Sequence, residues 1–402
     1  MHQWSPCSSV RPQMDRSKFT SCSPGELVLI TRHDSPTRKD WAFVPAELPV
    51  KWTFDPLLWP LLADARDRLG TLNGIGQTLD DPDLLLQPLQ SREAIKSSEI
   101  EGTTVTPEQY LLFELDPREP QSPSEESANW LEVLNCNVAL KTGCKMVAER
   151  PISSHIIRSM HAELMRGVRG RDKAPGQFRR KQVQIGSNAR YIAPPCAEVD
   201  RLMQNLDSYI ATDEVEVDPL IKCFVAHYQF EAVHPFEDGN GRVGRALLAL
   251  MVYKLFDHKR PWLYLSAFFD RFQDEYFDNL FRVSATGDWN RWIEFCLHAT
   301  VAQANDAIRR CDQFRALKAA FHTRLTSPSP RSQKLIDALF KSPVVRVTNV
   351  KRLFNVHYQT AQADIDRLVA VGILRPLRVL RPKTYYAPEI MAIAHDLDEA
   401  AT

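Results

Sequence analysis

The spacing of apolar residues along the chain predicts a mainly helical protein. From Trp41 onward, apolar side chains recur every three or four residues, which is the period of an amphipathic helix. Asp218-Pro219 is typical of a helix start, because aspartate is favoured at the N-cap and proline at the first helical position. The predicted helices span residues 57–69 with a stop at Gly70, about 89–100 with a stop at Gly102, 128–145, 153–166, 218 to about 233, 242–256 and 289–310.

One segment inside this helical body has the pattern of a β-hairpin. Between about Gln182 and Ala193, β-branched and aromatic residues lie on both sides of a Gly-Ser-Asn turn signal. The fold expected for residues 41 to about 320 is therefore mainly α, with one inserted hairpin.

The two ends of the chain differ from the body in composition. Residues 1–40 are rich in Ser, Pro, Arg and Lys with little periodicity, and this predicts a flexible leader, with at most one short strand at 27–30. A Ser/Pro-rich segment around 326–330 predicts a linker over 311–331. The last segment, 332–402, is expected to form a winged helix-turn-helix module from helices at 332–340, 347–354 and 359–371 and strands at 373–374 and 383–386.

Composition and charge narrow the function classes. The formal net charge is +0, so any contact with nucleic acid would need a local basic patch rather than a global field. The eight cysteines are dispersed without a C-x-x-C pair, which favours reduced thiols over a zinc site or a disulfide framework. No apolar run approaches the roughly 18 residues that span a membrane, and no signal-peptide core begins the chain, so a cytoplasmic location is expected.

The stretch HPFEDGNGRVGR at residues 234–245 concentrates candidate chemistry. Arg242 and Arg245 stand at a predicted helix N-terminus, where unpaired N–H groups and the helix dipole disfavour cations unless an anion is bound. The two glycines of Gly-Asn-Gly free the backbone to curve round a phosphate. Asp238 precedes this turn and suits Mg²⁺, while His234 could accept a proton from a hydroxyl. Each residue alone is more often structural, but the ordered string predicts a phosphate site.

This string resembles the H-x-F-x-D/E-G-N-G-R-x-x-R signature of the Fic domain family and matches it without a gap. Family members mostly transfer AMP from ATP to a hydroxyl side chain of a target protein. The resemblance implies a protein adenylyltransferase with a Fic-type helical core, ATP as substrate and Mg²⁺ as cofactor. It implies His234 as general base, Phe236 as the loop anchor, Asp238 as the metal ligand, and Gly239, Asn240, Gly241, Arg242, Val243, Gly244 and Arg245 as the ATP-binding stretch.

Two further segments are similar to parts of Fic proteins. The hairpin from about Gln182 to Ala193 resembles the flap that aligns the target backbone by strand addition, with Tyr191 and Ile192 as the expected clamp on the target side chain. The segment around Tyr276-Phe277 resembles the region near the nucleotide base. Many relatives carry two tyrosines there, so Phe277 would contact ATP without the hydrogen bond of a second tyrosine.

A second motif, Ser97-Ser-Glu-Ile-Glu-Gly102, places Glu101 in the last turn of a predicted helix, where the dipole disfavours an anion. Ser97 lies four residues earlier and faces the same way. Spacing alone is compatible with a solvated glutamate. The motif, however, resembles the inhibitory S/T-x-x-x-E-G/N motif of Fic proteins that carry a regulatory N-terminal helix, here residues 89–102 within a region at 41–127 before a catalytic core at 128–310. The resemblance implies that Ser97, Glu101 and Gly102 form the inhibitory segment and that Glu101 pairs with Arg245.

Several alternatives stay open from the sequence. The module at 332–402 would present Gln359 to Val371 as a recognition helix and Arg375, Arg378, Arg381 and Lys383 along its wing, either to DNA or to a protein. The chain is interpreted as an autoinhibited adenylyltransferase that modifies target proteins on Ser, Thr or Tyr and also itself. The alternatives are a DNA-binding regulator with an ATP-responsive Fic core and an enzyme of net AMP removal. A homodimer is compatible with the resemblance, and the target stays unidentified.

Overall fold

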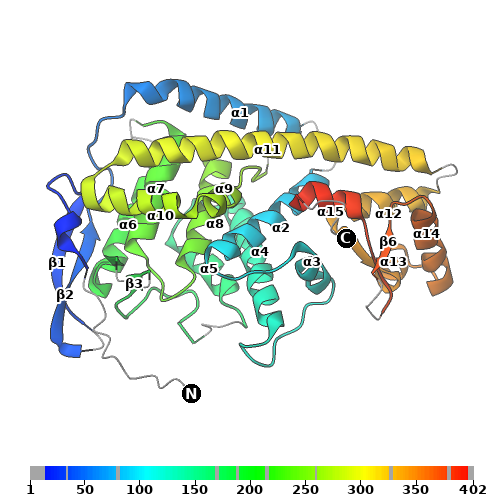
Figure 1. The fold of residues 1–402 in the computed structure, drawn as a ribbon, viewed down its shortest axis with the longest axis horizontal. Helices are drawn as coiled ribbons and strands as arrows, with labels where there is room; N and C mark the ends of the chain where they lie inside the picture. Colours follow the sequence, from blue (N-terminus) through cyan, green and yellow to red (C-terminus); the bar gives the residue numbers. More distant parts are fainter. Residues whose placement is uncertain are drawn as a thin grey trace, which may run out of the picture.

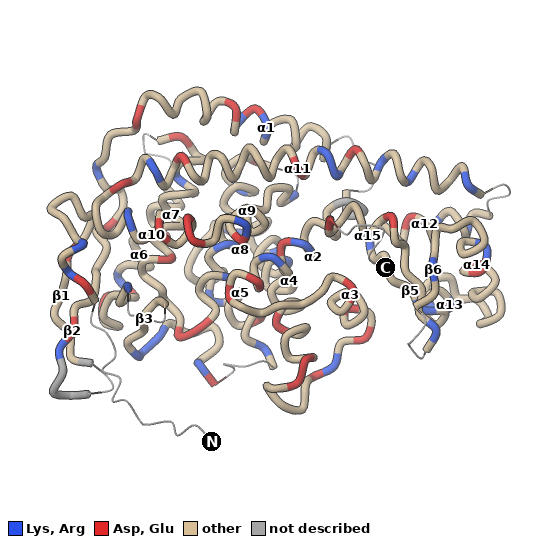
Figure 2. The backbone as a smooth tube through the Cα atoms, viewed as in Figure 1, with Lys and Arg blue, Asp and Glu red and all other residues tan. Residues whose placement is uncertain are grey.

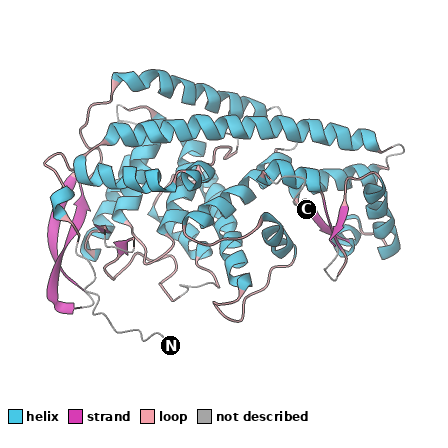
Figure 3. Cartoon of the chain, in the orientation of Figure 1, coloured by secondary structure: helices cyan, strands magenta, loops and turns pink. Residues whose placement is uncertain are grey.

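The chain is mainly helical in the computed structural model, which describes residues 14–32, 35–77, 82–167, 172–186, 190–212, 217–258, 260–325, 329–377 and 382–396. Helices dominate, and the strands form an N-terminal hairpin, a short pair in the central body and a sheet in the C-terminal part (Figure 3). The long helix α11 runs along the molecule from the N-terminal hairpin to the C-terminal module (Figure 1). No helix among the described residues is long and apolar enough to cross a membrane.

An antiparallel hairpin forms the N-terminal edge of the molecule. Strand β1, Gly25–Arg32, pairs with β2, Ser35–Pro45, in a register that sets Glu26 opposite Val44. Phe43 is fully buried in the main core. The expected flexible leader is therefore wrong for residues 25–32 and 35–40, because these residues form a paired hairpin whose second strand packs on the helical body. Residues 1–13 lie outside the described part. Short 3₁₀ helices occur at Arg16–Lys18 and Pro56–Leu58.

The next helices form the N-terminal part of the helical body. Helix α1, Trp59–Gln77, continues past Gly70, contrary to the predicted stop. Leu69 and Leu72 are both buried on its inner face, and their packing outweighs the roughly 1 kcal/mol cost of a helical glycine. Helix α2, Asp83–Ile100, ends where predicted, and Gly102 follows in the left-handed region with φ of 85°. Helix α3 spans Pro107–Leu115.

Five helices and a short strand pair make up the centre. Helix α7 is buried from Leu220 to Val233, and α8 packs on it, so α7 is surrounded by protein on nearly every side. Asp218 caps α7 by accepting from the Leu220 N–H, as the sequence predicted. Strands β3 and β4 pair antiparallel within the predicted hairpin. The bounds are Glu126–Glu149 for α4, Ser154–Leu164 for α5, Gln184–Ile185 for β3, Tyr191–Ile192 for β4, Cys196–Ala211 for α6, Pro219–Val233 for α7 and Asn240–Leu255 for α8.

Helix α11, Trp289–Arg324, connects the centre to the C-terminal module. It buries Trp292 in the main core and Phe321 in a second core. Because apolar residues continue at helical spacing after residue 310, the expected linker is helical as far as Arg324, and residues 326–328 lie outside the described part. Before it come α9, Ser266–Arg271, and α10, Gln273–Thr286.

The C-terminal module has its own core, built around Ile336, Ile365 and Leu368. Its three-stranded antiparallel sheet has the order β5-β7-β6, one strand more than the sequence predicted. Basic and acidic residues alternate along the whole molecule, including this module (Figure 2). The bounds are Pro330–Lys341 for α12, Val344–Arg346 for β5, Val347–Phe354 for α13, Tyr358–Ala370 for α14, Arg375–Leu377 for β6, Thr384–Tyr386 for β7 and Pro388–His395 for α15.

Candidate active site

A cavity of about 380 Å³ lies where the β3–β4 hairpin, the end of α7, the start of α8 and helix α10 meet. His234 and Arg245 line it, and so does Glu101 from the end of α2. The predicted string and the predicted inhibitory motif, more than 130 residues apart in sequence, therefore border the same space. The remaining lining residues are Ile185, Gly186, Arg190, Tyr191, Tyr228, Glu231, Ala232, Gly241, Tyr276, Phe277, Leu280, Phe281 and Ser284.

His234 is held at the end of α7 in an uncommon backbone conformation. Its φ of 50° and ψ of 61° place it in the left-handed region, which a non-glycine residue adopts only when its surroundings stabilise it. Its N–H donates to the Phe230 carbonyl at 2.9 Å, and its own carbonyl accepts from Arg179 Nε at 2.8 Å. Arg179 is buried and also donates to the Pro194 carbonyl at 2.6 Å. One arginine thus ties the hairpin to the backbone of His234.

The imidazole of His234 is set to be neutral at physiological pH. Burial, and after it the positive charge of Arg179, lower its pKa from 6.5 to about 4, although the carboxylate of Glu101 acts in the opposite direction. A neutral imidazole is the form that accepts a proton, so this environment suits a general base.

The turn after His234 is braced from inside. The amide side chain of Asn240 bonds both the N–H and the carbonyl of Phe236, at 2.8 and 2.9 Å. The ring of Phe236 stacks on His161 at 3.8 Å between centroids. His161 Nδ1 accepts from the Gly176 N–H at 2.8 Å, so its Nε2 carries the proton and donates to the Asp238 carbonyl at 3.0 Å. The predicted anchoring role of Phe236 agrees with its full burial.

Arg245 connects the start of α8 to the end of α2. Its guanidinium is 2% exposed and donates from Nη2 to Glu101 Oε1 at 2.7 Å and to the Ser97 carbonyl at 2.7 Å. Its Nε donates to Ser97 Oγ at 3.0 Å. The sequence-based expectation that Ser97 and Glu101 face Arg245 therefore agrees with the observed geometry. The cation near the start of α8 and the anion at the end of α2 neutralise each other.

The backbone at Gly241 leaves the space that Glu101 occupies. A Cβ at position 241 would overlap Glu101 Oε1 and crowd the Arg245 guanidinium. Partial burial would raise the pKa of Glu101, but the charge and the hydrogen bond of Arg245 outweigh it, and the pKa lies below its ordinary value. Glu101 is therefore ionised at neutral pH, with its side chain still 34% exposed toward the cavity.

Arg242 lies between two carboxylates. Its Nη1 donates to Glu132 of α4 at 3.3 Å and its Nη2 lies 3.9 Å from Asp238 Oδ1, while Arg245, its expected neighbour on the phosphates, lines the cavity. Glu132 also accepts from Thr103 Oγ1 at 2.9 Å, directly after the inhibitory motif. Both arginines of the string are thus paired with carboxylates from other helices.

Asp238, the expected metal ligand, is an accessible carboxylate in the turn before α8. Its side chain is 50% exposed, and Oδ1 accepts from the Gly239 N–H at 2.6 Å. Among the described residues, no three His, Cys, Asp or Glu side chains group as a protein-only metal site. A single accessible carboxylate fits Mg²⁺ that is held mainly by phosphate oxygens and water.

The expected clamp on a target side chain fits only in part. Tyr191 lines the cavity and donates from its hydroxyl to the Ala232 carbonyl at 2.8 Å. Ile192 is buried against Met14 and Ala42, so it faces away from the cavity, as alternation along a strand requires. The interpretation of Ile192 as a clamp residue is therefore wrong for this structure. Phe277 does line the cavity and is 38% exposed.

Three ionisable residues of the site were not identified from the sequence. Arg179 and Glu132 are buried partners of the string, and each comes from a separate element. Glu231 lies one turn before His234 and lines the cavity, and burial raises its pKa to about 8. A glutamate in an apolar helix that precedes the string was a possible signal for Glu231, whereas Arg179 and Glu132 depend on contacts that local spacing does not reveal.

Two segments of the chain match families. Residues 151–252 match the Fic/DOC family, and residues 59–145 match the Fic/DOC family N-terminal region. The chain therefore carries a Fic/DOC domain, and the resemblance seen in HPFEDGNGRVGR is confirmed at this level.

Named relatives are more distant. A probable protein adenylyltransferase of Aquifex aeolicus is 27% identical over 176 residues, which cover 44% of this chain and 51% of that protein. Protein adenylyltransferase Fic of Drosophila erecta is 29% identical over 125 residues, which cover 31% of this chain and 24% of that protein. This chain thus spans about half of the first relative and about a quarter of the second.

Two solved structures share the fold. A Fic family protein from Desulfovibrio desulfuricans G20 aligns with a TM-score of 0.55 at 21% identity, covering 84% of this chain and 97% of that chain. Fic-1 from C. elegans aligns with a TM-score of 0.52 at 20% identity, covering 66% of this chain and 75% of that chain. At such identities the likeness concerns the fold alone.

Proposed function

We propose that this protein is an adenylyltransferase that transfers AMP from ATP to a hydroxyl side chain, Ser, Thr or Tyr, of target proteins and of itself. The observation that carries the proposal is the buried Arg245 at the rim of a cavity of about 380 Å³ that also holds the neutral His234. A cavity of this size fits a nucleotide. The name of the A. aeolicus and D. erecta relatives supports the same activity.

The chemistry follows from these groups. The oxygen of the target hydroxyl attacks the α-phosphorus of ATP, the bond from that phosphorus to the bridging oxygen breaks, and pyrophosphate leaves. His234 takes the hydroxyl proton as the new P–O bond forms. The backbone N–H groups at Asn240 and Gly241 and the guanidinium of Arg245 stabilise the charge on the phosphates, and the Gly239 N–H would join them once it leaves Asp238 Oδ1. Mg²⁺, with Asp238 as its protein ligand, would neutralise phosphate charge when bound.

The Glu101–Arg245 pair is proposed to keep the enzyme inactive. The carboxylate occupies the anion position on Arg245 that the γ-phosphate of productively bound ATP would take. Two anions cannot share one buried guanidinium without strong repulsion, so Glu101 must move before ATP binds in a reactive position. The Glu132–Arg242 pair places a second carboxylate on the other arginine of the string.

The β3–β4 hairpin is proposed to receive the target. It borders the cavity through Ile185, Gly186 and Tyr191, and Arg190 reaches across to Asp278 of α10 at 2.6 Å. With only two residues in each strand, the hairpin leaves backbone groups for an added strand of the target.

The C-terminal module is proposed to be a winged helix that contacts protein. Its element order, α12, β5, α13, α14, β6, β7, suits that fold, and Arg378 and Arg381 of the expected wing lie outside the described residues. The module packs on α2 through α12 and α15 and on α3 through β5, so its observed partner is the rest of this chain.

The decisive assay uses purified protein, Mg²⁺ and ATP labelled at the α-phosphorus, with mass spectrometry of the modified residue. Wild type, Glu101→Gly and His234→Ala are compared, and ATP labelled at the γ-phosphorus is the control for phosphate transfer. We expect α-label on protein with Glu101→Gly, a weaker signal with wild type and none with His234→Ala. Incorporation of γ-label instead, or equal α-label with His234→Ala, would contradict the proposal.

A further inference from the structure

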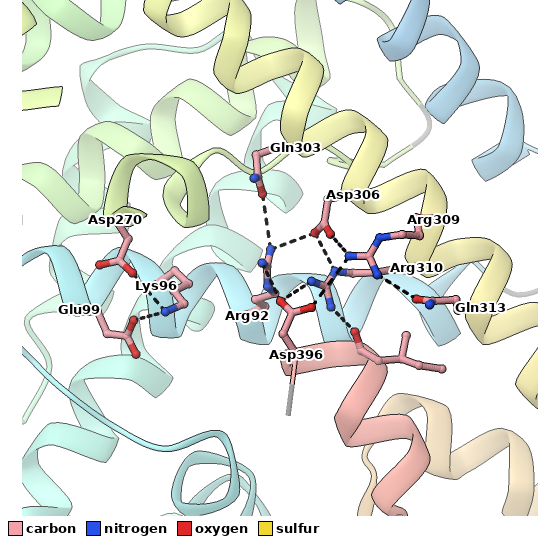
Figure 4. A network of polar contacts seen from close by, with 11 residues as sticks. Arg92, Lys96, Glu99, Asp270, Gln303, Asp306, Arg309, Arg310, Gln313 and Asp396 are labelled. Carbon is pink, nitrogen blue, oxygen red and sulfur yellow. Dashed lines mark hydrogen bonds and ion pairs between the residues drawn. The ribbon is translucent and has the colours of Figure 1, made fainter. Parts of the chain in front are cut away.

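Helix α2 also belongs to a partly exposed charge network with α11 and α15 (Figure 4). Arg92 reaches Asp306 of α11 from Nη1 at 3.2 Å and Asp396, at the end of α15, from Nη2 at 3.2 Å. Arg310 of α11 bonds the same two carboxylates, at 2.7 Å to Asp306 and 2.5 Å to Asp396, and donates to the Ile393 carbonyl. Three elements, α2, α11 and α15, thus share one cluster.

The charges of this cluster make Asp396 necessary. Three guanidinium groups, from Arg92, Arg309 and Arg310, meet two carboxylates, Asp306 and Asp396. The side chain of Arg310 is only 1% exposed, although that of Asp396 is 54% exposed, so water can offset the loss of this counter-ion only in part. Buried cations that lose one of two anions are strongly destabilised. If α15 moved away, Arg92 and Arg310 would both depend on Asp306.

A neighbouring histidine adds no compensating or competing charge at neutral pH. His395 precedes Asp396, and burial together with Arg92 and Arg310 lowers its pKa to about 3. The C-terminal module therefore contributes a negative charge to the cluster through Asp396.

The same helix carries the inhibitory residues. Arg92 and Glu101 are nine residues apart on α2, which is about 14 Å along a helix axis. Other contacts hold α2 from the α9–α10 side: Glu93 accepts from Ser266 Oγ at 2.5 Å, Lys96 pairs with Asp270 at 3.1 Å, and Gln273 donates to the Ile100 carbonyl at 2.8 Å. Because a helix moves nearly as a rigid body, its position at Arg92 affects the position of Glu101.

We propose that Asp396 and Arg92 form a clamp through which the C-terminal module holds α2, and with it Glu101, against Arg245. Arg92 is thus a positioning residue that acts through Glu101. A partner that draws α15 away from α2 weakens the Glu101–Arg245 pair and admits the γ-phosphate. The effect on catalysis rests on the proposed function, whereas the effect on α2 does not.

The test uses the full-length protein with Asp396→Asn, which removes the charge from the module side, and Arg92→Gln, which removes it from the α2 side. Glu389→Gln is the matched control, because Glu389 of α15 pairs with Arg324 of α11 at 2.5 Å and does not touch α2. Two readouts are taken: hydrogen–deuterium exchange of peptides covering residues 93–103 without ATP, and the rate of α-label incorporation.

We expect both clamp variants to exchange faster at residues 93–103 and to label about fivefold faster than wild type, the effect of losing one partly buried ion pair. Glu389→Gln stays at the wild-type values. In the Glu101→Gly background, Asp396→Asn adds nothing, because the clamp acts through Glu101.

The outcomes separate the clamp from the proposed function. Unchanged exchange at residues 93–103 in both clamp variants, with unchanged melting temperatures, would overturn the clamp. Faster exchange with no label in any variant, Glu101→Gly included, would support the clamp and overturn the proposed activity. If Asp396→Asn increases labelling further in the Glu101→Gly background, the clamp is also rejected, because the module would then act on labelling without Glu101.

Discussion

Helix α2 takes part in two arginine–carboxylate clusters, and the cavities beside these clusters differ in size. At its end, Glu101 pairs with Arg245 beside a cavity of about 380 Å³. Earlier on the same helix, Arg92 pairs with Asp306 and Asp396 beside a cavity of about 20 Å³. The larger space can take a nucleotide, while the smaller holds about one water. The same ion-pair chemistry therefore borders a nucleotide-sized cavity at the end of α2 and joins α2 to α11 and α15 in the middle of the helix.

Removal of the general base gives the largest expected effect at the cavity cluster. With His234→Ala, labelling falls by about a hundredfold or more, because proton removal from the hydroxyl loses its acceptor. The measurement is the initial rate of α-label incorporation in the Glu101→Gly background. His298→Ala, an exposed histidine of α11, serves as the control, and an equal loss there would undermine the assignment.

Release of the inhibitory carboxylate is the next largest effect. Glu101→Gly should raise labelling by about tenfold or more, since a charged hydrogen bond to a buried arginine is lost and the γ-phosphate can replace it. Glu101→Gln, which keeps the shape without the charge, should fall between Glu101→Gly and wild type. A wild type as active as Glu101→Gly would mean that the pair does not inhibit.

Substitution of Arg179 tests whether the pKa of His234 depends on the arginine that ties the hairpin to the backbone of His234. Arg179→Met removes a charge that lowers the pKa of His234, so that pKa should rise from about 4 toward 6.5. His234 then stays neutral to a lower pH in the wild type than in Arg179→Met. As the pH is lowered, the labelling rate of Arg179→Met should therefore begin to decline at a higher pH than the wild-type rate. Arg179→Lys retains the positive charge.

NMR titration of His234 in the apo protein measures the shift without relying on activity. If the pKa of His234 is equal in Arg179→Met and Arg179→Lys, the positive charge at position 179 does not lower it. The other ionisable groups near the ring, Glu101 of α2 and Glu231 of α7, are unchanged in both variants.

At the cluster that joins α2 to α11 and α15, removal of Arg310 should give the smallest effect, which we measure as a loss of thermal stability. Arg310→Met leaves Asp306 and Asp396 with fewer partners and should lower the melting temperature by about 5 °C. Differential scanning calorimetry measures this change. Arg315→Met on the exposed side of α11 is the control, and equal losses in both would indicate a general loss of helix stability.

Local patterns predicted most elements and failed where packing outweighed them. The helices at 89–100, 128–145 and 153–166 were recognised from their spacing, and so was the cap at Asp218. Helix α1 continued through Gly70, and α11 continued through the expected linker, because their buried faces stabilise them beyond any local stop signal. The β1–β2 hairpin was missed since its burial comes from contact with distant helices.

The sequence by itself determined the chemistry of the candidate site. The order of residues in HPFEDGNGRVGR and the spacing of Ser97 and Glu101 are local properties. A glycine-containing turn before a helix presents backbone N–H groups to an anion in any fold. Only the tertiary structure decided which charges meet. Arg242 pairs with Glu132, Arg179 holds His234, and Asp396 reaches Arg92, because chain packing brings together groups whose separation in sequence carries no signal.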